Sequence, residues 1–213
     1  MASDLLRQLG SREITKIKLF KMVESDFGLL PAVLEGALSS KATVRYGCGS
    51  ILVDLSKKYP DRLYPYMNNF VALLNSEHRI LTWNALAAIA NLTAVDSDRR
   101  FDAIFDKYYG FLGNEYMVTV ANVVANSAKI ITNKPYLTDQ ILAELLKVQD
   151  LQVTPHLTEE CKLVIAQATI GVFNTLIKYT QNKEALFAFA QKHQNSSRTK
   201  LKIEAQNFLK RWQ

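Results

Sequence analysis

The sequence predicts an all-α protein made of stacked helix pairs, an α-solenoid. Apolar residues recur at spacings of three and four, which is the period of a helix with one buried face. A short phrase of mostly apolar residues around one Asp or Asn also repeats along the chain. Its clearest copies are residues 51–55, 88–92 and 123–127, and weaker copies are residues 171–175 and 204–208. Intervals of 37, 35, 48 and 33 residues separate its polar members, Asp54, Asn91, Asn126, Asn174 and Asn207. Such a period leaves room for two short helices in each repeat.

Proline and clusters of Ser, Asp and Asn mark the ends of the helices, because they stop one helix and cap the next. We expect a first helix at residues 11–24, followed by five helix pairs at about 29–58, 63–93, 99–131, 138–179 and 183–212. The second helices, which carry the repeated phrase, are expected at 42–58, 79–93, 116–131, 158–179 and 198–212. One pair of this size cannot cover its own apolar face, so we expect the pairs to stack into a single domain over residues 1–213.

Charge is concentrated near the end of the sequence. Residues 1–177 hold 18 Lys/Arg and 18 Asp/Glu, whereas residues 178–213 hold eight Lys/Arg and two Asp/Glu, so the net charge of +6 lies in this last part. The candidate basic patch consists of Lys178, Arg198, Lys200, Lys202, Lys210 and Arg211. Two interpretations remain open: a surface that contacts nucleic acid or another anionic surface, or the charged outer face that a terminal repeat needs for solubility.

The rest of the composition indicates a cytoplasmic protein. The N-terminal residues lack the apolar core of a signal peptide, and no run of about 18 uncharged apolar residues occurs, so we expect no membrane span. Cys48 and Cys161 lie far apart and outside any metal-ligand spacing, which is typical of small buried residues in a reducing compartment.

No arrangement of reactive side chains predicts an enzyme. His78, His156 and His193 each lack a second metal ligand at helical spacing and a neighbouring nucleophile motif. The adjacent Glu159 and Glu160 fall in the first turn of an expected helix, where the helix dipole favours acidic residues. We therefore expect no catalytic residues, no metal site and no cofactor.

The repeated polar residues form the candidate binding site. Residues seven apart share a helix face, and Asn84 precedes Asn91 by seven. The candidate residues are Asp54, Asn84, Asn91, Asn126, Asn174 and Asn207. Amides carry both donors and acceptors, so a row of them suits a peptide backbone or polar loops. The alternative is that these side chains bond to one another or to nearby backbone and fix the register of the helix–helix seams.

Two segments resemble the HEAT and armadillo repeat families. Residues 38–45 (LSSKATVR) are similar to the turn of a HEAT repeat, and residues 88–93 (AIANLT) are similar to the third helix of an armadillo repeat. The resemblance covers residues 27–213 and implies a right-handed α-α superhelix. In armadillo proteins the repeated asparagines line a concave groove and bind the backbone of an extended peptide. The resemblance gives this role to Asn91, Asn126, Asn174 and Asn207, with Asp54 in the first repeat. The tryptophan that armadillo proteins carry one turn earlier is replaced here by Ala87, Asn122, Ile170 and Ile203.

These observations favour a non-enzymatic scaffold that binds a protein or peptide on the concave face of its second helices. The alternative is a nucleic-acid-binding HEAT-repeat protein that resembles the alkylpurine DNA glycosylases and uses the basic patch. A third hypothesis makes the chain one part of a larger helical-repeat assembly. The identity of the partner and the oligomeric state are left open by the sequence.

Overall fold

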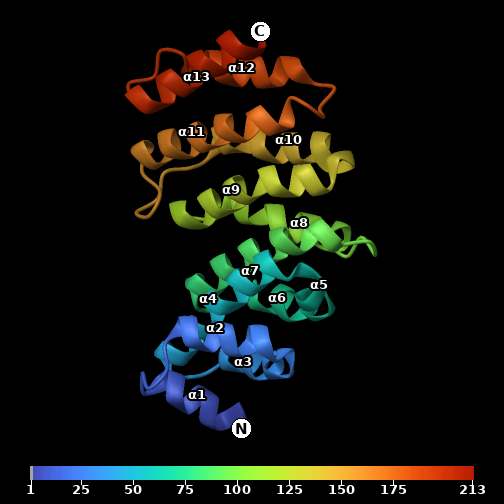
Figure 1. The fold of residues 1–213 in the computed structure, drawn as a ribbon. Coiled ribbons are helices and arrows are strands. Elements are labelled where there is room, and N and C mark those ends of the chain that lie inside the picture. The colour runs from blue at the N-terminus through green and yellow to red at the C-terminus, as the bar shows by residue number, and fades with distance from the viewer. Residues whose placement is uncertain (1) are drawn as a thin grey trace. The chain divides into compact units, whose positions relative to one another are not determined.

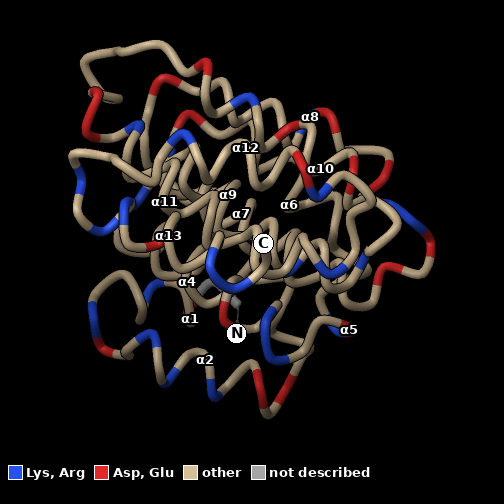
Figure 2. Tube along the Cα trace, turned by 90° about the horizontal axis from the view of Figure 1, so that it is seen from above, with Lys and Arg blue, Asp and Glu red and all other residues tan. Residues whose placement is uncertain are grey.

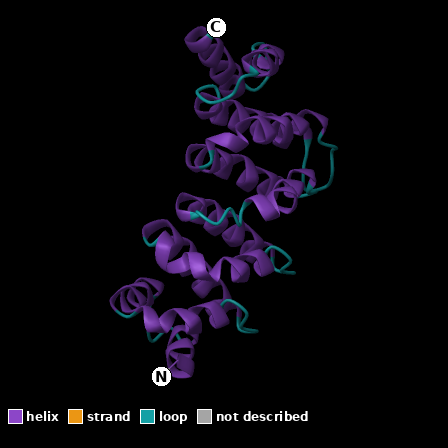
Figure 3. Cartoon of the chain, turned by 90° about the vertical axis from the view of Figure 1, so that its right-hand side faces the viewer, coloured by secondary structure: helices purple, strands orange, loops and turns teal. Residues whose placement is uncertain are grey.

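The computed structural model describes residues 2–213, with side-chain environments from residue 4 onward. Within that range the protein is all-α, as the sequence predicts (Figures 1 and 3), and its extended backbone is limited to an isolated bridge between Thr154 and Leu157. The chain divides into two compact units, one ending at Phe101 and one beginning at Asp102. A single domain over residues 1–213 stays a prediction.

Unit 1 contains a leading pair of helices and two repeats. Its α-helices are α1 (Ala2–Gly10), α2 (Lys16–Ser25), α3 (Leu30–Gly36), α4 (Ala42–Lys58), α5 (Pro60–Leu63), α6 (Met67–Leu73) and α7 (Arg79–Leu92). Its 3₁₀ turns are η1 (Phe27–Leu29), η2 (Tyr64–Tyr66) and η3 (Thr93–Val95). The second helices of the two repeats, α4 and α7, pack against each other, while α3 packs on α4 and α6 packs on α7.

Unit 2 continues the same alternation. Its α-helices are α8 (Phe105–Tyr109), α9 (Met117–Asn133), α10 (Thr138–Leu146), α11 (Glu159–Leu176), α12 (Lys183–His193) and α13 (Thr199–Trp212). Its 3₁₀ turns are η4 (Asp102–Ile104), η5 (Gly110–Gly113), η6 (Pro135–Leu137) and η7 (Lys147–Asp150). Here α11 is the central second helix, because it packs against both α9 and α13.

The first helix predicted at residues 11–24 begins too early, and a helix before it was not predicted. In the structure α2 begins at Lys16, and residues 11–15 form the turn that joins it to the preceding helix α1. Arg12 adopts a left-handed conformation with φ 65°, and the backbone N–H of Glu13 donates to the carbonyl of Gln8 at 2.9 Å. This pattern is a Schellman C-cap, which ends α1. Thr15 then caps α2 by accepting from the backbone N–H of Lys18 at 3.1 Å.

The core lies between the layers of first and second helices. Ile51, Leu55 and Ile89 are examples of its fully buried side chains, each of which contributes about 1.5–3 kcal/mol by leaving water. Cys48 is also buried in this core, and burial raises the pKa of its thiol to about 12. Cys161 is half-buried, and neither cysteine forms a disulfide.

Candidate binding face on the second helices

The second helices place the six candidate polar residues in different environments. Asp54 on α4 and Asn207 on α13 are exposed. Asn84, Asn126 and Asn174 are half-buried, and Asn91 is buried. The shared sequence pattern therefore does not correspond to one shared chemical role.

Asn91 joins two second helices. Its side chain is only 6% exposed, and its Nδ2 donates to the Oγ of Ser56 at 2.9 Å and to the carbonyl of Val53 at 3.4 Å. Both acceptors lie on α4, whereas Asn91 lies on α7. The buried hydroxyl of Ser56 in turn donates to the Val53 carbonyl at 2.7 Å. In unit 1 this amide therefore fixes the register of the α4–α7 seam.

Asn84 lies against the same seam, two turns earlier in α7. A Cβ built on Gly49 would lie 2.6 Å from the Nδ2 of Asn84 and 2.9 Å from the Cδ2 of Leu81. A side chain at this position would require the ends of the Asn84 and Leu81 side chains to move, and Leu81 is buried. The Asn84 amide therefore fills the space above Gly49.

Asn126 and Asn122 bond within their own helix. The Nδ2 of Asn126 donates to the Asn122 carbonyl at 2.9 Å, and the Nδ2 of Asn122 donates to the Val118 carbonyl at 2.8 Å. Both side chains are half-exposed on α9. Their amides are not used to join α9 to a neighbouring helix, which leaves them on the accessible side of unit 2.

Asn174 accepts a hydrogen bond across the α11–α13 seam. The donor is the indole Nε1 of Trp212, at 3.0 Å. Earlier on the same two helices, the Nε of Arg198 donates to the Oε1 of Gln167 at 3.2 Å, and its guanidinium forms an ion pair with Glu160. Polar side chains therefore link α11 to α13 at both ends of the seam.

The structure divides the predicted basic patch. Lys178, Lys200, Lys202, Lys210 and Arg211 are exposed. Arg198 is different, because its side chain is only 25% exposed and is committed to Glu160. The guanidinium of Arg211 lies 4.9 Å from the centroid of the Trp212 ring.

Each second helix carries exposed or half-exposed residues along one side, and we call these residues the open stripe of that helix. They are Thr43, Tyr46, Ser50, Asp54 and Lys57 on α4; Ile80, Trp83 and Ala87 on α7; Val118, Asn122 and Ala125 on α9; Gly171 on α11 and Lys178 just beyond its end; and Lys200, Ile203, Asn207 and Lys210 on α13. Sequence reasoning missed the apolar members of the open stripe. Ile80 and Val118 each occupy the second position of their helix, and this repeated apolar residue ahead of the buried face could have revealed them.

The histidines contact aromatic rings or apolar surroundings. His156 stacks on Tyr116 with ring centroids 4.3 Å apart, and His78 meets Tyr46 edge-on at 6.2 Å. Burial, followed by the charge of Lys192, lowers the pKa of His193. Within residues 2–213, no group of three or more His, Cys, Asp or Glu side chains is arranged to hold a metal ion. None of the helices in that range is both long enough and apolar enough to cross a membrane.

Comparison with solved structures identifies the fold. A designed armadillo repeat protein superposes with a TM-score of 0.56 at 19% sequence identity, over 100% of this chain and 93% of its own. An engineered protein determined by a structural genomics consortium gives a TM-score of 0.50 at 16% identity, over 98% of this chain and 87% of its own. No protein-family model and no curated protein sequence matches the chain. The protein therefore has an all-α, armadillo-like repeat fold along its length.

Proposed function

We propose that this chain is a non-enzymatic scaffold that binds a protein or peptide partner on the open stripes of its second helices. The observation that carries the proposal is the exposure of large apolar side chains on those helices. Ile80, Val118 and Ile203 are 41%, 44% and 50% exposed, although each belongs to a helix whose other faces are packed. A partner that covers them would remove apolar surface from water at about 25 cal/mol per Å².

The amides divide between two roles in this proposal. Asn91 and Asn174 serve the seams inside each unit. Asn126, Asn207 and Asp54 are the members available to a partner, because they are half-exposed or exposed and, among the residues that the structure describes, make no bond to another helix. An amide on such a surface can pair with both the N–H and the carbonyl of a peptide backbone.

The test compares capture of partners by matched variants of the full chain. Ile80→Glu with Val118→Glu places charges on the open stripes of α7 and α9. Val153→Glu with Tyr179→Glu makes the same change at exposed apolar residues outside the second helices. We expect the first pair to abolish capture of a specific protein from the source cell and the second pair to leave it intact. If capture persisted in the Ile80→Glu, Val118→Glu variant and disappeared in the Val153→Glu, Tyr179→Glu variant, the partner would bind outside the second helices.

Nucleic-acid binding is the second candidate, and the five exposed cations of the basic patch are its support. Trp212 weighs against glycosylase-like chemistry, because its indole N–H is bonded to Asn174 and its ring is covered by Arg211. Lys200→Glu with Lys210→Glu would lower the affinity for duplex DNA, and the log–log salt slope would fall by about 0.9 for each phosphate that the variant no longer neutralises. A gel-shift titration that shows no retardation at low salt eliminates this candidate.

A cytoplasmic location belongs to the same proposal. Its support is the pair of free thiols, Cys48 and Cys161, which are typical of a reducing compartment.

A further inference from the structure

A cavity of about 580 Å³ opens in unit 1, where the turn between α1 and α2 meets the first turns of α4. Its lining residues are Leu9, Arg12, Ile14, Thr15, Lys16, Ala42, Thr43, Tyr46 and Gly47. Its volume lies in the range of cavities that bind ligands, about 300–1,000 Å³. Thr43 and Tyr46 belong to the open stripe of α4, so the cavity lies at the beginning of that stripe.

The floor of the cavity is apolar and its edge is cationic. Leu9 and Ile14 are buried, and Gly47 adds no side chain between them and α4. Arg12 and Lys16 are exposed, and within residues 2–213 neither forms an ion pair. Figure 2 shows that basic positions recur along α2, the helix that Lys16 begins.

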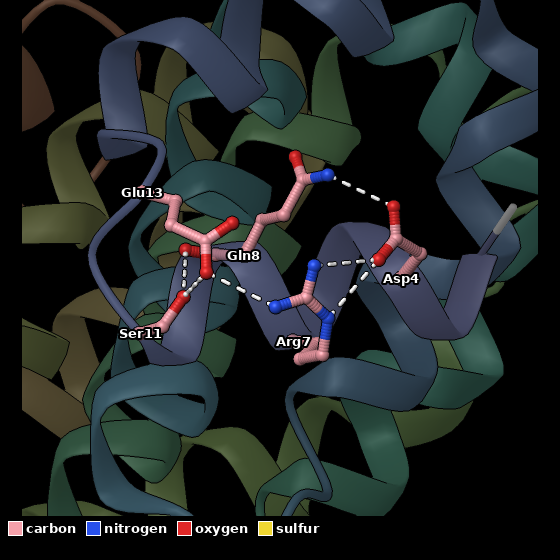
Figure 4. Close-up of polar contacts among 5 residues, drawn as sticks. All are labelled: Asp4, Arg7, Gln8, Ser11 and Glu13. Atoms are coloured by element: carbon pink, nitrogen blue, oxygen red, sulfur yellow. Dashed lines mark hydrogen bonds and ion pairs between the residues drawn. The ribbon is translucent and has the colours of Figure 1, made fainter.

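The acidic residue nearest in sequence is committed elsewhere. Figure 4 shows Glu13 turned toward α1, where its Oε1 accepts from the Nη1 of Arg7 at 3.0 Å and from the Oγ of Ser11 at 2.7 Å. The hydrogen bond from Ser11 and the charge of Arg7 lower the pKa of Glu13. Arg7 also forms an ion pair with Asp4 at 2.9 Å. The two carboxylates of this network are therefore paired with Arg7 and not with Arg12 or Lys16.

Arg12 also occupies a position that favours glycine. It is the left-handed residue of the Schellman cap that ends α1, with φ 65°. Glycine would adopt this conformation without steric cost, and it would remove the guanidinium from the edge of the cavity.

We propose that this cavity binds an acidic peptide segment of the partner. Carboxylates of the segment pair with Arg12 and Lys16, and an apolar side chain covers Leu9 and Ile14. The assignment rests on the proposed scaffold function and names the chemistry of one part of its partner. A peptide fits better than nucleic acid because two cations surround an apolar floor, whereas nucleic-acid sites follow a row of phosphates with many Lys and Arg.

The test uses a short fluorescein-labelled peptide in which Asp and Glu flank a single Leu. Binding to the full chain is measured by fluorescence anisotropy at about 0.15 M ionic strength, where charges more than about 8 Å apart are largely screened. We expect the double variant Arg12→Glu, Lys16→Glu to weaken binding by at least about tenfold. A peptide with Ser in place of Leu would bind more weakly than the parent peptide.

Lys18→Glu is the matched control. It makes the same charge change two residues after Lys16, on the opposite side of α2, because two residues turn a helix by about 200°. We expect this variant to bind like the wild type. Arg12→Gly provides a variant whose backbone is compatible with the fold, and we expect it to bind the peptide more weakly as well.

Three outcomes would overturn the assignment: no binding of the acidic peptide to the wild type, equal weakening with Lys18→Glu, or unchanged binding in the double variant. Displacement of the peptide by inorganic phosphate or by a single-stranded oligonucleotide at equal concentration would overturn it in favour of a general anion site or a nucleic-acid site. The partner-capture experiment uses other residues, so failure of this cavity is distinguishable from failure of the scaffold function.

Discussion

Arg12 shows how one residue can work against the stability of its own turn. The Schellman cap requires a left-handed residue, and a side chain in that conformation costs about 1–2 kcal/mol relative to glycine. Exposed hydrogen bonds from Arg7 and Ser11 to the Glu13 carboxylate span the same turn.

Replacing this residue therefore gives a prediction about stability. We expect Arg12→Gly to raise the free energy of unfolding by about 1 kcal/mol, measured by urea denaturation. Arg12→Ala keeps the strain and removes the same guanidinium, so we expect no comparable stabilisation from it. Lower stability in Arg12→Gly would show that the arginine side chain makes interactions that outweigh the strain.

A second prediction concerns the repeated asparagines. Asn91→Ala removes the hydrogen bonds to Ser56 and Val53 and leaves a buried hydroxyl short of a partner, so we expect the free energy of unfolding to fall by about 1–2 kcal/mol. Asn207→Ala changes an exposed residue at the corresponding place in α13, and we expect an effect within about 0.5 kcal/mol. Thermal melts of the two variants measure the contrast. Equal destabilisation would contradict the assignment of Asn91 to the seam.

The sequence could place both asparagines on second helices but could not separate their roles. The acceptors of Asn91 lie 35 and 38 residues earlier in the chain, so its role depends on how closely α7 approaches α4. The phrase around Asn91 (AIANL) is more apolar than the phrase around Asn207 (EAQNF), which indicates deeper burial, but neither phrase shows which residues of another helix bond to the amide. Burial at a seam is a property of two helices, and a pattern read along one helix does not contain it.

At the scale of the elements, helix ends could be predicted from the sequence where a proline or a capping residue marks them. The predicted bounds of α4 match the structure, because Pro60 lies beyond its end, and the fifth pair begins at residue 183 as predicted, because Asn182 caps α12. The break between α1 and α2 was missed because it uses an arginine where glycine is usual. The first helix predicted to begin at residue 63 begins later, as α6 at Met67, because Pro65 lies in the 3₁₀ turn η2; the short helix α5 before it was not predicted.

Two glycines inside second helices, Gly49 and Gly171, allow the effect of the same substitution to be compared at a crowded site and at an open site. A Cβ on Gly49 would crowd the Nδ2 of Asn84 and the Cδ2 of Leu81, whereas a Cβ on Gly171 would meet nothing within 4 Å. Alanine in a helix is favoured over glycine by about 1 kcal/mol. We expect Gly171→Ala to stabilise the protein by about that amount. We expect Gly49→Ala to destabilise it by about 1–3 kcal/mol, because the cost of overpacking exceeds the benefit in helix propensity.

Chemical denaturation of both variants measures the difference between the sites. If Gly49→Ala were as stabilising as Gly171→Ala, the side chains of Asn84 and Leu81 would move aside for the added methyl group without cost. That result would also remove the reason for a glycine at this position of α4.

At the scale of the whole molecule, the repeat period predicted the fold class, because two helices in each period must share a core with their neighbours. The position of the open stripes was less predictable. Their apolar members, such as Ile80 and Val118, look like core residues in a sequence, whereas the packing within each unit leaves them facing solvent.

The single-domain prediction can be tested with the two tryptophans of the chain, because Trp83 lies in unit 1 and Trp212 in unit 2. In Trp212→Phe the remaining fluorescence reports unit 1, and in Trp83→Phe it reports unit 2. Neighbouring repeats unfold together when the free energy of the interface between them is large compared with the stability of a single repeat. If residues 1–213 form one domain, the fluorescence midpoint of each variant in urea will coincide with its own midpoint by far-UV circular dichroism. Separate midpoints within one variant would show that the boundary between Phe101 and Asp102 divides two independently unfolding domains. The open stripes of each unit would then have to bind the partner without those of the other unit.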